Sequence, residues 1–457
     1  MRSTLRRRLR RWRRTGTRPS SGRAWTPGIA AFALVLALAQ PAFAAPSWAP
    51  PRELSDAASA PLNLGATAGL APTGSGVVLW HSAAGVEAAV RASGHNFGKP
   101  RAISGSKLSM PDLRPSLAFD AKGAALAVWS YFEPHPRFVQ DGYAVDYTFG
   151  LRVAARAANG AFGRAQTLTG KLDADPSADV AFDPKGNAVV IWTDEAGVHA
   201  AARQAGKRRF GHAQVIGQAQ ADPQVTVGTS GTATAAWAAQ AHGSWSVSAS
   251  AADNGAAFGS AVALEIPGLG KAKPVIGVDG RSAVTAAWSA RGRVMAATCA
   301  ASGHCGAAHA LSAAGETASD PHVAVASDGT AVVAWRSAVG VSAALRRGHS
   351  RFGAARRLAK LGSGAGVTAL TAAVGPRGDA AALWCVHTSD GDQVQAALRH
   401  GARSRFAPVS NLTAKIAGAH WSDPQVELDA RGDALAIWGA LVDGHPSIQA
   451  SAFDAHA

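Results

Sequence analysis

The chain has 457 residues, with 45 Lys and Arg against 30 Asp and Glu, a formal net charge of +15 at pH 7. Residues 1–44 contain ten of the arginines and no acidic residue, which leaves 35 basic and 30 acidic side chains in residues 45–457. The excess charge lies mainly in this leader, so it does not indicate a nucleic-acid-binding domain, and we expect no nucleic-acid partner.

The first 44 residues have the three parts of a secretory signal peptide. The arginines precede an apolar run at Ile29–Ala39, and Ala42-Phe43-Ala44 provides a small-residue cleavage site. The run is shorter than the ~20 residues that cross a bilayer, and no later stretch is long and apolar enough to do so. We predict cleavage after Ala44, no membrane span after removal of the signal, and a secreted, periplasmic or cell-envelope protein of residues 45–457.

A short apolar segment ending in tryptophan recurs eight times after the leader, at Trp80, Trp129, Trp192, Trp237, Trp288, Trp335, Trp384 and Trp438. A glycine lies six residues before seven of these tryptophans, and Ser282 replaces it in the fifth unit. A proline lies fourteen residues before five of them, at Pro115, Pro223, Pro274, Pro321 and Pro424. A regular unit of about fifty residues indicates a repeat protein.

Each unit contains four short runs, which the unit that begins at Pro115 illustrates as PSLAFD, AALAVW, GLRVAAR and FGRAQTLTG. Gly, Asp and Asn separate the runs, which are too short for packed helices and are typical of strands joined by turns. Four strands at this period are typical of a propeller blade. We therefore predict an all-β closed propeller of about eight four-stranded blades, called strands a to d from first to last.

The two ends of the chain complement each other. The last unit ends after its third strand, SIQASAF, whereas residues 48–55 match the fourth strands of other units. Such a strand would complete the last blade and remove the exposed edges of an open ring. We predict that residues 48–55 close the propeller, which we expect to be a monomer.

The repeats resemble those of the broad propeller superfamily that includes the sialidases and the WD40 proteins, over nearly all of residues 45–457. The resemblance implies the architecture alone, because the sialidase aspartate box and the Gly-His and Trp-Asp pairs of WD40 repeats are missing. Nothing matches a zinc protease, a P-loop, a dinucleotide fingerprint or a G-x-S-x-G elbow. We therefore expect no cofactor and no metal, and we favour a non-enzymatic protein.

Two cysteines replace a repeated pair of residues. The third strand of most units ends in arginine and the fourth begins with phenylalanine, as in Arg203 and Phe210, so we expect a guanidinium to lie on a ring. In the fifth unit Cys299 and Cys305 occupy both positions, which predicts a disulfide in an exported protein. Cys385 has no partner, and we expect a buried free thiol.

The loops divide between two faces of different chemistry. Turns between strands a and b and between c and d carry Lys122, Lys185, Arg281, Arg377, Arg431, Lys207, Arg208, Arg209, Arg347, Arg351, Arg403 and Arg405. The b–c and d–a loops carry Asp173, Asp175, Asp194, Glu195, Asp222, Glu316, Asp320, Asp390, Asp392, Asp423 and Asp443. We call these the basic face and the loop face. The basic face is either a solvated rim or a docking surface for an anionic polymer.

The loop face also carries the candidate ligand-binding residues. All three tyrosines, Tyr131, Tyr143 and Tyr147, fall in an insertion at residues 131–150, and Trp245 and Trp421 fall on other loops of this face. Exposed aromatic rings beside carboxylates are typical of surfaces that dock a glycan or a protein, the two partners that we consider. The insertion could instead bury its own rings. The alternative function is a glycosidase-like enzyme that uses Glu133, Asp141 or Asp146.

Overall fold

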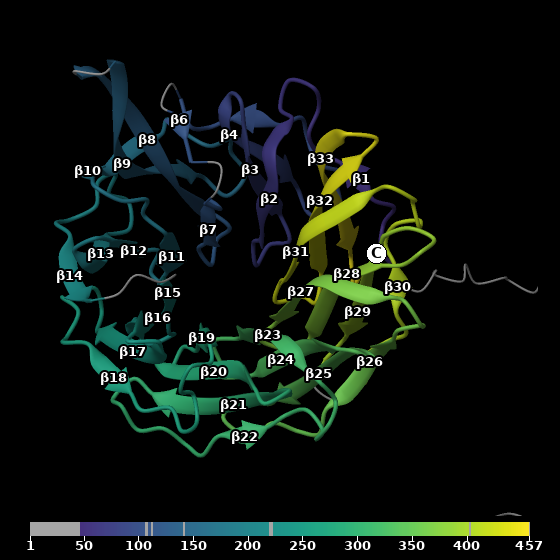
Figure 1. Ribbon diagram of the computed structural model, residues 1–457. Coiled ribbons are helices and arrows are strands. Elements are labelled where there is room, and N and C mark those ends of the chain that lie inside the picture. Colours follow the sequence, from purple (N-terminus) through teal and green to yellow (C-terminus); the bar gives the residue numbers. More distant parts are fainter. Residues whose placement is uncertain are drawn as a thin grey trace, which may run out of the picture. The chain divides into compact units, whose positions relative to one another are not determined.

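The computed structural model describes residues 46–105, 108–110, 113–139, 142–218, 223–401 and 404–456. The predicted signal peptide, Asp141, Asp222 and Arg403 lie outside these ranges. The described elements are β-strands arranged in eight antiparallel sheets, as predicted (Figure 1). In the part of the chain that the structure describes, no helix is long and apolar enough to cross a membrane.

The first four sheets follow the chain order. Blade 1 contains β2 (Pro61–Leu70), β3 (Gly76–Ser82), β4 (Gly85–Arg91) and β5 (Arg101–Ala102). Blade 2 contains β7 (Ser116–Phe119), β8 (Ala125–Val139), β9 (Gly142–Arg156), β10 (Gln166–Leu172) and an additional short strand, β6 (Leu108–Ser109). Blade 3 contains β11 (Ala178–Phe182), β12 (Ala188–Asp194), β13 (Gly197–Arg203) and β14 (Gln214–Gly217). Blade 4 contains β15 (Pro223–Val227), β16 (Ala233–Ala241), β17 (Ser244–Ala252) and β18 (Val262–Leu264).

The remaining sheets complete the ring. Blade 5 contains β19 (Val275–Val278), β20 (Ala283–Ala290), β21 (Arg293–Ala300) and β22 (His309–Ala310). Blade 6 contains β23 (Ser319–Val325), β24 (Ala331–Ser337), β25 (Gly340–Arg346) and β26 (Arg356–Lys360). Blade 7 contains β27 (Gly366–Val374), β28 (Ala380–His387), β29 (Gln393–Arg399) and β30 (Ser410–Asn411). Blade 8 contains β31 (His420–Leu428), β32 (Ala434–Val442), β33 (His445–Phe453) and, from the start of the chain, β1 (Arg52–Glu53).

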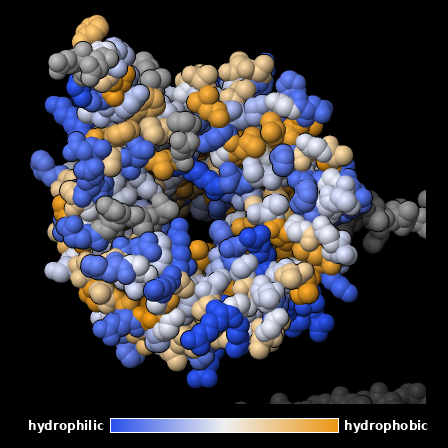
Figure 2. All heavy atoms as spheres, in the orientation of Figure 1, coloured by the Kyte–Doolittle hydropathy of each residue, from blue (hydrophilic) through white to orange (hydrophobic). Residues whose placement is uncertain are grey.

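The first strand of each blade stands at the centre of the ring. These inner strands contact one another in the order β2, β7, β11, β15, β19, β23, β27 and β31, and β31 contacts β2 again. The succession closes a circle of eight blades around a central opening (Figures 1 and 2).

The repeated tryptophans form the core between neighbouring blades. All eight are at most 2% exposed, and they lie on second strands whose two faces are both covered, such as β3. Trp129 of blade 2 packs with Leu79 of blade 1, and Trp438 of blade 8 packs with Leu383 of blade 7. A buried aromatic side chain removes 150–250 Å² from water, so each tryptophan joins two sheets that share no backbone hydrogen bonds.

The turn between the first two strands has its own hydrogen-bonding motif. The Asp120 carboxylate accepts the backbone N–H groups of Lys122 and Ala124 at 2.9 and 2.8 Å, and Asp183, Asp279 and Asp429 repeat this pattern. Gly123 adopts φ +86° there, a region that glycine enters without steric cost. In the fifth unit Ser282 replaces this glycine and adopts the same left-handed conformation, with φ +64°.

The start of the chain completes the last blade, as the sequence predicts. Arg52 pairs with Ala450 in antiparallel register, and the Leu54 N–H donates to the Ile448 carbonyl at 2.8 Å. Ahead of this pairing, the half-buried Trp48 forms a bridge with Phe453, with ring centroids 5.7 Å apart. The N-terminal strand therefore covers the edge of β33.

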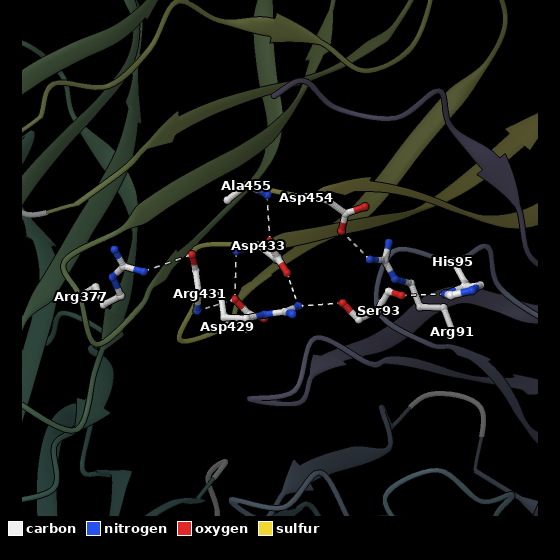
Figure 3. Close-up of polar contacts among 9 residues, drawn as sticks. All are labelled: Arg91, Ser93, His95, Arg377, Asp429, Arg431, Asp433, Asp454 and Ala455. Carbon is white, nitrogen blue, oxygen red and sulfur yellow. Dashed lines mark hydrogen bonds and ion pairs between the residues drawn. The ribbon is translucent and has the colours of Figure 1, made fainter. Parts of the chain in front are cut away.

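Side chains hold blades 8 and 1 together on the basic face (Figure 3). Arg431, held by Asp429 and Asp433 of its own turn, donates to the Ser93 hydroxyl of blade 1 at 2.9 Å. Arg91 of blade 1 forms an ion pair with Asp454 at 2.7 Å. These contacts join residues more than 300 positions apart, so only closure of the ring brings them together.

The outer hairpins confirm the predicted side-chain pairings. Cys299 and Cys305 form a disulfide with a Cα–Cα distance of 3.9 Å. The Arg203 guanidinium lies over the Phe210 ring at 5.4 Å, and Arg346 lies over Phe352 at 5.3 Å. Cys385 is a buried free thiol, and burial raises its pKa to about 12.

Candidate functional site

The structure separates the two kinds of loop as the sequence predicts. The a–b turn of blade 6 meets the c–d hairpin of the same blade, because a Cβ on Gly329 would lie 2.8 Å from the His349 ring. On the other face, the b–c turn at Trp245 donates its N–H to Gly270 of the following d–a loop at 2.8 Å. The basic face and the loop face are therefore opposite ends of the blades.

The insertion of blade 2 forms a two-stranded ribbon on the loop face. Strands β8 and β9 pair continuously, from Ala125 with Arg156 to Val139 with Gly142. The ribbon extends well beyond the other strands of its blade and projects from the ring (Figure 1). Its register continues that of the blade, where Trp129 pairs with Arg152, so the alternation of side chains between two sides continues along the ribbon.

The two sides of this ribbon differ in chemistry. On one side lie Phe132, Pro134, Pro136, Phe138, Tyr143, Val145, Tyr147 and Phe149, which we call the aromatic side. Two ring pairs occur there, Phe138 with Tyr143 at 6.0 Å and Phe132 with Tyr147 at 5.8 Å. The opposite side carries polar pairs, among them the ion pair of Arg137 with Asp146 at 2.6 Å.

The rings near the end of the ribbon are open to solvent. Phe138 is 90% exposed, Tyr143 63% and Tyr147 50%. Large apolar side chains are usually covered in a folded domain, and a group of exposed ones marks an interaction surface. The insertion does not fold back over these three rings.

The other predicted ligand-binding residues lie elsewhere. Tyr131 is 4% exposed, at the base of the ribbon against Gly150 and Gly170, and Trp421 is 4% exposed in the core between blades 7 and 8. Trp245 is partly buried in blade 4, with the Lys273 ammonium 5.7 Å from its ring centroid. Of the five residues, the structure brings only Tyr143 and Tyr147 together at the surface.

Charged side chains gather where the inner strands begin. Arg114, just before the first strand of blade 2, reaches past blade 1 to form an ion pair with Asp423 of blade 8 at 2.5 Å. Asp320 of blade 6 accepts a hydrogen bond from Arg336 at 2.5 Å. Both aspartates adopt positive φ, +46° for Asp320 and +48° for Asp423, a strained conformation that is often found at functional sites.

Ionisable residues continue along the inner strands. Burial raises the pKa of Glu427 on β31 to about 7. Desolvation, and then the Arg114 guanidinium, lower the pKa of His322 on β23, a residue that is nevertheless accessible to solvent. Burial also raises the pKa of Asp179 on β11, although hydrogen bonds from Val225, Val180 and Ser116 lower it. Hydrophilic side chains surround the central opening (Figure 2).

The site residues predicted from the sequence do not include Arg114, Arg336, His322 or Glu427. One signal was available, because Arg114, Lys273, Asp320 and Asp423 each directly precede the repeated proline. That position therefore places a charged residue at the start of an inner strand in several blades. Across the described residues, no group of three or more His, Cys, Asp or Glu side chains could hold a metal ion.

The basic face contains two hollows beside blade 3. One, of about 950 Å³, lies between blades 3 and 4 and is lined by residues that include Arg203, Lys207 and Phe258. The other, of about 540 Å³, lies between blades 2 and 3 and includes Arg208 and Leu168. We refer to the two together as the seam groove.

No protein-family model matches the chain, and no curated protein matches it. Among solved structures it is similar to the Dos1 propeller, with a TM-score of 0.51 and 9% identity over 90% of this chain and 94% of that one. It is also similar to the polysaccharide lyase Uly1, with a TM-score of 0.39 and 8% identity over 71% and 88% of the two chains. For the α-L-arabinofuranosidase PaAbf62A from Podospora anserina, the TM-score is 0.27 and the identity 10%, over 52% and 91%. The first likeness supports the β-propeller fold, and at such identity it extends to the fold alone.

Proposed function

We propose that this chain is an exported, non-enzymatic recognition propeller that binds an extended glycan on its loop face. The observation that carries the proposal is the aromatic side of the β8–β9 ribbon, where Phe138, Tyr143 and Tyr147 are exposed on an element held away from the ring. The apolar surface of this side is removed from water only when a ligand covers it.

The dimensions of the ribbon favour a polymer over a small ligand. Tyr143 and Tyr147 belong to different ring pairs and lie four residues apart on β9, about 13 Å at the usual rise of a strand. Their hydroxyl groups supply hydrogen-bonding capacity beside apolar rings. An extended glycan has both apolar ring faces and hydroxyl edges along its length, and it could cover the two ring pairs at once.

The rival candidate is a glycosidase-like enzyme, and the observation that favours it is the raised pKa of Glu427, which would allow this carboxyl to donate a proton near neutral pH. Paired glycosidase carboxyls lie about 5–9.5 Å apart. The other carboxyl of β31 is Asp423, which lies four residues earlier, beyond a register irregularity, and is ion-paired with Arg114. Glu133 and Asp146 lie on the polar side of the ribbon, where Asp146 is paired with Arg137.

The test shortens the ribbon and measures both binding and turnover. Replacing residues 134–147 by Asn-Gly joins Glu133 to Thr148, a cross-strand pair that a two-residue hairpin turn can connect. We expect the unmodified chain to bind a member of a panel of oligosaccharides without cleaving it, and the shortened chain to bind that sugar at least ~10-fold more weakly, a change of about 1.4 kcal/mol.

A double variant and a control variant provide the matched comparison. Phe138→Ser with Tyr143→Ser should weaken binding in the same direction, whereas Val339→Ser, which changes an exposed apolar residue on a b–c turn of blade 6, should not. Unchanged affinity in the shortened chain would show that the ribbon is not the binding element. Release of sugar products that stops in Glu427→Gln, Glu133→Gln, Asp141→Asn or Asp146→Asn would establish the enzyme instead.

A further inference from the structure

The basic segment of blade 3 separates the two hollows of the seam groove. Lys207, Arg208 and Arg209 are consecutive exposed residues in its c–d hairpin. Lys207 lines the larger hollow, Arg208 the smaller, and Arg209 both. In the described ranges none of the three has an ion-pair partner, so their charges face the hollows without compensation.

Arg203, the third cation that lines the larger hollow, stands out when the blades are compared. Arginines that end other third strands all have polar partners. Arg346 donates to the Gly329 carbonyl at 3.0 Å, and Arg399 donates to Gly378 at 2.9 Å. Arg156 donates to Gly160 at 2.8 Å, and Arg91 pairs with Asp454.

Arg203 occupies the same repeat position and differs from them. It stacks on Phe210, but among the described residues its guanidinium has neither a hydrogen-bond acceptor nor a carboxylate partner. Burial lowers the pKa of Arg203, which reflects the cost of desolvating a cation that nothing neutralises. An arginine nevertheless remains charged in proteins. An anion in the adjoining hollow would supply the missing partner.

We propose that the seam groove binds a linear acidic polysaccharide, with one anionic sugar unit in the larger hollow beside Arg203, Lys207 and Arg209. A hollow of about 950 Å³ is at the upper end of the volumes that hold organic ligands, and it is far larger than an inorganic anion needs. The smaller hollow, on the other side of the basic segment, provides room for a neighbouring unit of the same chain.

The lining of the groove favours a sugar over a nucleic acid. The walls of the larger hollow include the small residues Ala200, Ala202, Ala233 and Ala252, against which the apolar edge of a sugar can pack. Single-stranded nucleic acids instead need open aromatic rings on which bases stack. Phe210 is covered by Arg203, and Phe258 is 8% exposed.

The test measures the binding of four probes by calorimetry: a galacturonate hexamer, neutral cellohexaose, inorganic sulfate and single-stranded oligothymidine. We expect the galacturonate hexamer to bind the most tightly, with an affinity that falls as salt is added. Lys207→Gln with Arg209→Gln should weaken this binding at least ~10-fold, and Arg203→Gln should weaken it as well.

The matched control is Arg351→Gln with Arg405→Gln. These exposed arginines directly precede Phe352 and Phe406, as Arg209 precedes Phe210, but they do not line the seam groove. The control should bind the hexamer as the unmodified chain does. The chain with the shortened ribbon should also bind it normally, so this inference and the proposed function can fail separately.

Three results would overturn the inference. The first is an unchanged affinity of the Lys207→Gln, Arg209→Gln chain, whose substitutions are on the surface and leave the core intact. The second is oligothymidine binding as tight as that of the hexamer. The third is sulfate binding as tight as that of the hexamer, which would reduce the site to one for small anions.

Discussion

At the scale of single residues, burial changes the protonation of the Glu427 carboxyl. It lies on the innermost strand of blade 8, and no hydrogen bond or ion pair to another described residue supports its charge. Burial therefore favours the protonated form and raises its pKa from the usual 4.5 to about 7. The folded chain binds a proton there that the unfolded chain has already lost.

This difference predicts how stability changes with pH. Between about pH 4.5 and pH 7 the folded state binds more protons at Glu427 than the unfolded state, so this residue lowers the free energy of unfolding as pH rises, by up to about 3 kcal/mol. Glu427→Gln should flatten that part of the curve and be more stable than the unmodified chain at pH 8. Urea unfolding at a series of pH values measures this, and parallel curves for the two chains would contradict it.

The disulfide is also a single-residue feature, and its contribution should be small. Cys299 and Cys305 are six positions apart, and closing so short a loop removes little entropy from the unfolded chain, at most ~3 kcal/mol. Cys299→Ser with Cys305→Ser should therefore fold and melt slightly earlier. Reductant should lower the melting temperature of the unmodified chain to that of the variant and leave the variant unchanged. Loss of the fold in the variant would contradict the estimate.

At the scale of elements, the two-residue strand β1 protects the edge of the last blade. It pairs with β33, and the next two residues extend the contact. The Leu54 N–H donates to the Ile448 carbonyl, and the Ile448 N–H donates to the Ser55 hydroxyl at 3.0 Å. Without this segment, β33 would present unpaired backbone groups at an edge, which promotes aggregation.

We therefore predict that a chain beginning at residue 57 melts earlier than one beginning at residue 46, or aggregates. Trp48→Ala should reproduce part of the loss. Because Trp48 is half-buried, we expect about 1–3 kcal/mol, below the ~3–5 kcal/mol of a fully buried tryptophan. Thermal unfolding with light scattering measures both effects. Equal stability of the chains beginning at residues 46 and 57 would mean that β1 does not hold the ring closed.

At the scale of the whole molecule, the ring separates two surfaces that the chain builds from the same repeat. The a–b and c–d turns carry exposed cations beside the aspartates of the turn motif at one end of the blades. The b–c and d–a loops carry the ribbon and both acidic and basic residues, such as Asp423 and Arg114, at the other. The blades between them are joined by buried tryptophans, such as Trp129 against Leu79. The two proposed binding sites therefore share a rigid support but no side chain.

Four features of this protein can be predicted from the sequence alone: the blade count, the strand order, the closing strand and the disulfide. Each of these depends on a local pattern that recurs at a fixed period, so that comparison of units within one chain reveals which residues face each other. The pairs Cys299 with Cys305 and Trp48 with Phe453 occupy the same place in the repeat, between the end of a third strand and the start of a fourth. The closed ring follows because neither terminal segment can satisfy its strand edge alone.

Which repeated residues are available for binding depends on packing in the folded chain, which the repeat pattern does not contain. Tyr131 and Tyr143 belong to one insertion, yet the base of the ribbon is packed on its own blade and the end is not. Arg203 and Arg346 share a repeat position, and their difference depends on which acceptors surround each guanidinium. The Arg114–Asp423 ion pair joins residues 309 positions apart. Burial and partners of this kind are set by neighbouring blades, whose side chains vary independently of the repeat pattern.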